Sequence, residues 1–166
     1  AGAKTVLRDV VSDFRFLERD QNEPDYEIVD ELTDKFTYDQ DVTAGYLSAN
    51  IGLGEKYGLL AGVRYEHTYI NGNLEEQSNP FTNEYDNFLP NITLSRNFNQ
   101  TTTLKASYNK RIQRPGLRQI NPFVERNNVQ NISFGNPELD PEITHQYELN
   151  LNIFIKKVLL NTSVYY

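Results

Sequence analysis

Apolar and polar side chains alternate along most of this chain with a period of two residues, which predicts extended strands with one apolar face. The alternation is strictest at residues 146–155, where the apolar set is Tyr147, Leu149, Leu151, Ile153 and Ile155 and the polar set is Gln146, Glu148, Asn150 and Asn152. About ten such residues cross a bilayer when the strand is tilted. The pattern is typical of a transmembrane β-barrel strand, with its apolar face toward lipid, but strands of soluble sandwiches also alternate.

Similar patterns predict six further strands, at residues 1–17, 42–54, 57–70, 87–98 and 102–112 and from Val158 onward. Proline lacks the N–H group that a strand interior needs, so we expect Pro90 near the beginning of its strand. Arg96 falls on the apolar face close to a turn, where its long side chain can reach toward water.

The connections between these strands alternate in length. Short turns are expected at 54–57, 97–101 and 156–157, and long loops at 18–41, 71–86 and 113–144. An antiparallel meander with short turns at one end and long loops at the other is typical of an outer-membrane barrel, and a sandwich has no reason to keep this asymmetry. The predicted fold class is therefore all-β, an antiparallel transmembrane β-barrel meander with about seven strands of a larger barrel.

Composition narrows the function classes. The 166 residues include no cysteine, which excludes disulfides, thiol nucleophiles and thiolate metal sites. A net charge of −7 argues against nucleic acid as a partner, because nucleic acids select basic surfaces. Eleven tyrosines and nine phenylalanines suit the aromatic girdles of a barrel.

Candidate catalytic and metal-binding groups are few. His67 and His145 have neither the serine and aspartate partners of a triad nor a second histidine at helical spacing, so we expect no enzyme and no cofactor. Carboxylates crowd residues 18–41 and are suitable calcium ligands, but the segment lacks the ligand spacing and turn glycine of an EF-hand. We expect a solvated acidic loop and no metal site.

The candidate ligand-binding residues are four arginines in an otherwise acidic chain, Arg111, Arg114, Arg118 and Arg126. Guanidinium forks suit carboxylate, phosphate or catecholate oxygens, and four of them predict an anion-binding patch at a lumen mouth. The alternatives are pairing with Glu125, Glu138 or the acidic loop, and contact with lipopolysaccharide phosphates. Aromatic residues at positions 85, 123 and 134 either stack on a sugar or aromatic ligand or pack the loops together.

Five segments carry a family resemblance: LLAGVRYEHTYING at 59–72, FLP at 88–90, RIQRP at 111–115, INPF at 120–123 and GNPELDPEITHQYEL at 135–149. From about residue 36 onward the chain resembles the C-terminal barrel of TonB-dependent outer-membrane receptors, and most closely the outer-membrane β-barrel group common in Bacteroidetes.

The resemblance implies a location in the bacterial outer membrane and a plugged barrel of about 22 strands. It implies import of a bulky nutrient such as a siderophore, an oligosaccharide or a peptide. The implied partners are outer-membrane lipid, the rest of the barrel and its plug, a TonB-type energy-coupling protein and surface lipoproteins.

The sequence also departs from the complete family pattern, because it contains no plug, energy-coupling segment or regulatory β-domain. Seven strands cannot close a plugged barrel, and bacterial barrels have even strand counts. We therefore expect residues 1–166 to be a segment of an outer-membrane β-barrel domain, with a small complete barrel of about eight strands as the alternative. The functional alternatives are a non-transporting barrel that serves as scaffold in a surface or secretion assembly, and a soluble β-sandwich binding module.

Overall fold

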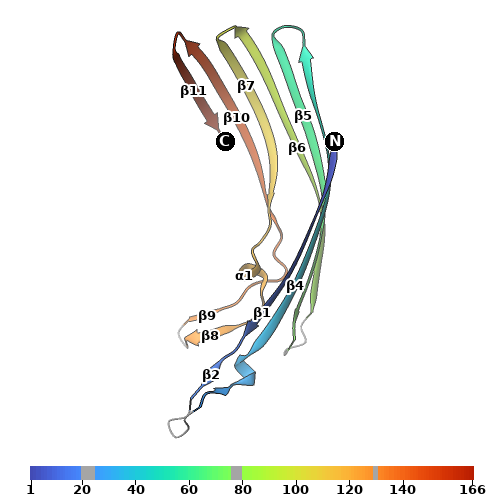
Figure 1. Cartoon of the computed structure of the whole chain (residues 1–166), viewed down its shortest axis with the longest axis vertical. Helices are drawn as coiled ribbons and strands as arrows, with labels where there is room; N and C mark the ends of the chain where they lie inside the picture. Colours follow the sequence, from blue (N-terminus) through green and yellow to red (C-terminus); the bar gives the residue numbers. More distant parts are fainter. Residues whose placement is uncertain (20–24, 76–79, 129–130) are drawn as a thin grey trace.

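A computed structural model describes residues 1–19, 25–75, 80–128 and 131–166 of the chain. Its main feature is a curved antiparallel sheet of seven strands in the order β1-β4-β5-β6-β7-β10-β11 (Figure 1). These strands are β1 (Gly2–Phe14), β4 (Asp34–Leu53), β5 (Tyr57–Leu74), β6 (Phe81–Asn99), β7 (Thr102–Gln113), β10 (Glu142–Ile155) and β11 (Val158–Tyr165). The connections contain β2 (Leu17–Glu18), β3 (Glu27–Ile28), the 3-10 helix η1 (Asp30–Leu32), α1 (Leu117–Ile120), β8 (Glu125–Asn128) and β9 (Asn131–Ser133).

The sheet is open at both edges among the described residues. Strand β1 pairs only with β4, and β11 pairs only with β10. The predicted all-β meander is confirmed, and the unclosed sheet is consistent with a partial barrel. Among the described helices, none is long and apolar enough to span a membrane.

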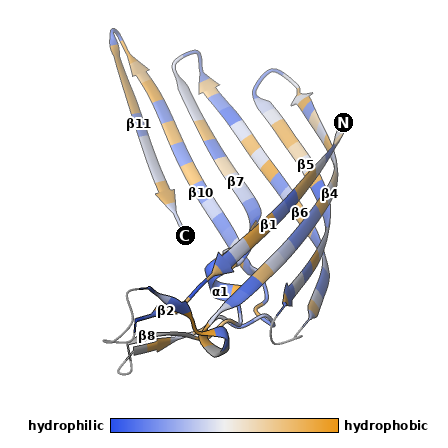
Figure 2. Cartoon of the chain, turned by 60° about the horizontal axis from the view of Figure 1, so that its bottom comes forward, coloured by the Kyte–Doolittle hydropathy of each residue, from blue (hydrophilic) through white to orange (hydrophobic). Residues whose placement is uncertain are grey.

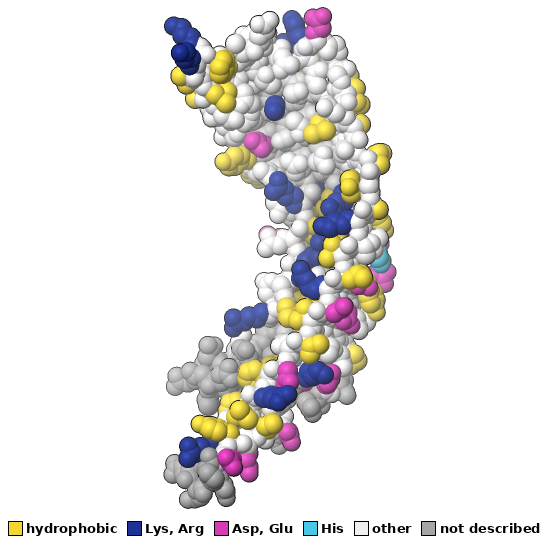
Figure 3. Space-filling model, in the orientation of Figure 1, with side chains coloured by type: hydrophobic (Ala, Val, Ile, Leu, Met, Phe, Trp, Pro, Cys, Tyr) yellow, Lys and Arg dark blue, Asp and Glu magenta, His cyan; other side chains and the backbone are white. Residues whose placement is uncertain are grey.

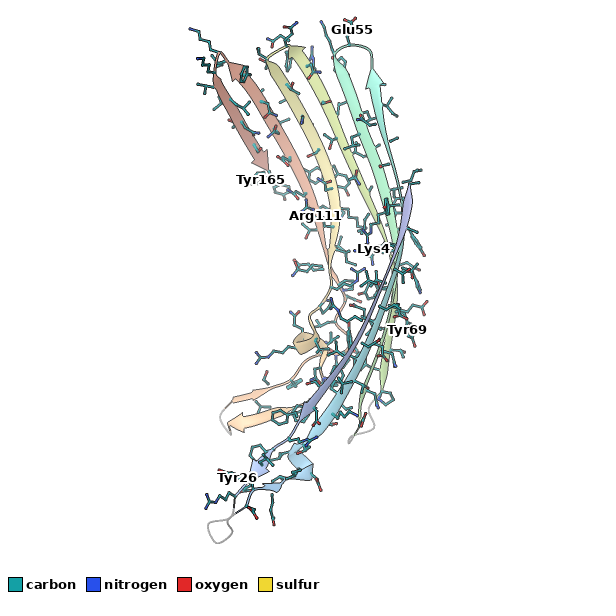
Figure 4. The ribbon with its side chains drawn as sticks, in the orientation of Figure 1. Lys4, Tyr26, Glu55, Tyr69, Arg111 and Tyr165 are labelled. Carbon is teal, nitrogen blue, oxygen red and sulfur yellow. The ribbon has the colours of Figure 1, made fainter. Side chains whose placement is uncertain are left out.

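The strand register assigns the two faces of the sheet. Leu47 pairs with Val63, and Ile92 pairs with Tyr108, which in turn pairs with Tyr147. Directly paired residues project to the same side, so the apolar positions of neighbouring strands form one continuous convex surface. The alternation of apolar and polar positions is visible along the strands in Figure 2, and Tyr69 lies on the convex side in Figure 4.

Strands β4, β5 and β6 are longer than predicted, so the assignment of residues 34–41, 71–74 and 81–86 to loops is wrong. In these extensions the apolar residues change face. Phe36 and Tyr38 of β4 are each 2% exposed and lie on the concave side, whereas Asp39 is exposed on the convex side. Protein covers the concave side here, so the apolar side chains turn toward that cover.

Pro90 lies inside β6, where it pairs with Val63 of β5, and the prediction that it begins a strand is wrong. Its position is tolerated because the pairing of β6 with β7 extends only from Asn99 to Asn91. Arg96 stacks on aromatic rings, because its guanidinium carbon lies 5.5 Å from the ring centre of Tyr57 and 4.6 Å from that of Phe98. Its reach toward water stays a prediction. The short turns are confirmed, and Gly54 adopts a positive φ of 68° in the first of them.

Candidate functional site

The connection between β7 and β10 folds back over the concave face of the sheet at the end that carries the long loops (Figure 1). Ile120 of α1 is 3% exposed and belongs to a buried cluster formed with Phe36, Tyr38, Ile70 and Leu74. Phe123 is partly buried against the same cluster, and its ring centre lies 4.9 Å from that of Phe14 on β1. The connection is therefore a packed structural layer with its own apolar contacts.

Arg114 anchors the first residues of this connection to the wall. Its Nη2 group donates to Glu66 Oε2 and, at 3.1 Å, to Thr68 Oγ1. The side chain of Glu66 is only 5% exposed and also forms an ion pair with Arg64, while Thr68 is fully buried. A carboxylate held by two guanidinium groups keeps its charge compensated at a site with little water.

Gly135 joins the two arms of the connection, which are the segment around α1 and the segment that follows β9. Its N–H donates to the Asn121 carbonyl at 2.8 Å, and the Asn136 N–H donates to the Gln119 carbonyl at 2.7 Å. A Cβ at position 135 would lie 2.6 Å from each of these two carbonyl oxygens. Only glycine allows the backbone segments to approach this closely, which explains the first residue of the GNP motif.

Gly135→Ala is therefore expected to separate the two arms and to destabilise the folded connection by about 1–3 kcal/mol, the usual range for forced overpacking. Limited proteolysis of the full-length protein would measure this as faster cleavage between positions 114 and 141. Gly116→Ala is the matched control, because a Cβ there meets only the Gln119 side chain, at an ordinary 3.5 Å. Equal cleavage rates for the two variants would contradict the assigned role of Gly135.

The four predicted arginines do not form one patch among the described side chains. Arg111 and Arg114 line a cavity of about 380 Å³ between β6 and β7. Arg118 borders a separate cavity of about 50 Å³ beside Phe134. The side chain of Arg126 is outside the described part of the chain. Ligand binding by these residues remains a prediction.

The predicted pairing of these arginines with Glu125, Glu138 or the acidic loop missed the carboxylate that Arg114 contacts, Glu66 of β5. The two residues are 48 positions apart, so only the strand order brings them together. A local signal did exist, because Glu66 is a carboxylate on the concave side of a strand two positions from Arg64.

The three aromatic candidates were predicted either to stack on a ligand or to pack the loops together, and they differ in their surroundings. Tyr85 and Phe123 pack against the buried cluster, as loop packing requires, while Phe134 is 70% exposed. Within the described ranges, no group of three or more His, Asp or Glu side chains is arranged to hold a metal ion.

Comparison with known proteins gives two findings. The model of the outer membrane protein beta-barrel family matches residues 1–166. The solved structure of the copper transporter OprC aligns with 98% of this chain at a TM-score of 0.63 and 16% sequence identity. The chain spans 26% of the length of the OprC chain. No protein in the comparison with curated sequences matches significantly.

Proposed function

The chain belongs to the outer membrane protein β-barrel family of the bacterial outer membrane, and we propose that it forms part of the wall and extracellular loops of a TonB-dependent transporter. The observation that carries this proposal is the seven-stranded sheet with two unpaired edges, which aligns with about a quarter of a transporter chain. An open edge leaves a row of backbone donors and acceptors without partners, so more strands are needed on both sides.

The proposed cargo is a bulky nutrient such as a siderophore, an oligosaccharide or a peptide. The packed connection between β7 and β10 supports this proposal, because it covers the concave face at the end with the long loops, which is extracellular in outer-membrane barrels. A folded layer at this place narrows the entrance of a wide barrel and presents exposed groups such as Phe134 and Arg118 to an arriving ligand. A plug and a TonB-type energy-coupling protein complete the proposed machinery, and a surface lipoprotein is a further proposed partner.

This function is tested by comparing nutrient uptake in cells that lack the full-length protein with uptake in complemented cells. Radiolabelled siderophores, oligosaccharides and peptides would be supplied separately to deleted and complemented cells. Loss of uptake of one class is expected, with a similar loss when a protonophore removes the energy source of wild-type cells. Equal uptake of all three classes in deleted and complemented cells would contradict transport and favour a scaffold barrel.

A further inference from the structure

The β6–β7 ladder ends at the pair Asn91–Asn109, and from there toward the long-loop end the two strands separate. From this pair toward the long-loop end, β6 continues to Phe81 beside β5, and β7 continues to Gln113 beside β10. No ladder joins β6 and β7 across this seam in the described residues, and the cavity of about 380 Å³ lies there. In a membrane barrel such a seam is a place where the lumen side and the lipid side of the wall meet.

Pro90 explains why the ladder ends there. The Asn97 N–H donates to the Lys56 carbonyl on the β5 side, so odd-numbered residues of this part of β6 direct their backbone groups toward β5 and even-numbered ones toward β7. Continuing the register beyond Asn91–Asn109 places Pro90 opposite Lys110. Proline has no N–H to donate to the Lys110 carbonyl, so the next bond of the ladder is missing.

The lining of the seam is strongly cationic. Arg64, Lys110, Arg111 and Arg114 surround one carboxylate, Glu66. Glu66 is already held by Arg64 and Arg114, whereas Lys110 and Arg111 form no ion pair with any described residue. Lys and Arg side chains gather near mid-height in Figure 3, and Arg111 is labelled on β7 in Figure 4.

Lys110 and Arg111 are neighbours on one strand and therefore point to opposite faces of the sheet. Both nevertheless line the same cavity, because no strand separates them from it on the β6 side. The side chains of Asn91 and Asn109 border the same cavity and add amide donors. The seam thus combines a cation from each face with neutral donors, a set that suits an oxyanion with several acceptor oxygens.

Aromatic residues on the convex face flank the start of the seam. Because β6 and β7 run antiparallel, Phe88 and its partner Tyr65 lie two positions from Pro90 toward the long-loop end, whereas Tyr108 and its partner Tyr147 lie two positions from Lys110 toward the short-turn end. Aromatic rings gather at the level of the membrane interface in outer-membrane barrels. Lys110 lies on the convex face between these two aromatic pairs, within the zone that borders the lipid headgroups.

We propose that the β6–β7 seam is a binding site for a phosphate group, with Lys110 and Arg111 as its binding residues. The site differs from the predicted patch of four arginines, because it adds Lys110 and does not include Arg118. The phosphate has two possible sources, the headgroup of a phosphorylated outer-leaflet lipid on the convex side or a free phosphate in the lumen. The proposal does not depend on transport.

Binding to the full-length protein in detergent, measured by native mass spectrometry and calorimetry, tests the site. The probes are bis-phosphorylated lipid A, its dephosphorylated form and inorganic phosphate. The double variant Lys110→Gln/Arg111→Gln is expected to weaken binding of the phosphorylated probe by at least about tenfold, since each charged hydrogen bond is worth about that factor. Lys156→Gln/Lys157→Gln removes the same charge from a distant turn and is expected to leave binding unchanged.

The two sources give different results. Lipid A binding that is lost on dephosphorylation and insensitive to added inorganic phosphate identifies a lipid site. Direct binding of inorganic phosphate that is lost in the seam variant identifies a lumen site. If wild-type protein binds neither phosphorylated probe, or if the seam and control variants bind them equally well, the proposal is wrong.

Discussion

Glu66→Gln is expected to destabilise the packed connection between β7 and β10 by about 3 kcal/mol. Glutamine keeps the shape of the side chain but removes the charge that holds Arg64 and Arg114 together. Two neighbouring cations then repel each other at a site where the acidic side chain was 5% exposed. The expected cost is at the low end for a broken buried pair, because side-chain exposures of 37% for Arg64 and 22% for Arg114 leave both cations some contact with water.

Hydrogen exchange of the full-length protein measures this effect at the backbone amides of residues 116–123. A loss of about 3 kcal/mol corresponds to opening that is roughly a hundredfold more frequent. Glu84→Gln is the matched control, because it makes the same chemical change in a carboxylate that is 63% exposed on the convex face. In the Glu66→Gln background, Arg114→Gln should recover part of the lost stability, since it removes one of the two cations that repel each other. Equal exchange in the Glu66 and Glu84 variants would refute the anchor.

Ala106→Arg is expected to destabilise the barrel by about 2–4 kcal/mol, whereas Ser107→Arg should cost far less. Both positions lie on β7 and gain the same side chain. Ala106 is on the convex face between Leu94 and Leu149, so the new charge enters the apolar band. Ser107 is on the concave face between Thr93 and Glu148, where polar groups and a carboxylate receive it.

The measurement is the free energy of unfolding of the full-length protein from lipid vesicles in guanidinium chloride. Because the two substitutions differ only in the face of the strand, their difference isolates the environment of the convex surface. Two similar losses would mean that the convex face does not contact lipid, and would contradict its assignment from the register.

Much of the fold follows from local patterns. The period-two alternation around Leu149 identifies the strand type and its apolar face, because successive side chains of an extended chain point in opposite directions. Short turns such as Gly54–Lys56 are equally local, since two or three residues determine their geometry. These features need no knowledge of distant contacts.

Strand ends were less predictable. Residues 34–41 contain the alternation of Phe36 and Tyr38 with Thr37 and Asp39, but its apolar set lies on the opposite face from Leu47 and Ile51. The carboxylates that crowd residues 18–41 led to the prediction of a solvated loop for this segment. The prediction fails for residues 34–41 because their apolar side chains are covered on the concave face by Ile120 and its neighbours.

The amino-acid pattern was sufficient for the strand type, the apolar face of the strands near the short turns and the short turns themselves, because each depends on neighbours within a few positions. The pairing of Arg114 with Glu66 across 48 positions, the contact of Gly135 with the end of α1 and the seam beside Pro90 depend on strand order and register. These are non-local quantities, set by which strands become neighbours and where each ladder stops. The candidate site is therefore a property of the folded wall, although every residue in it is visible in the sequence.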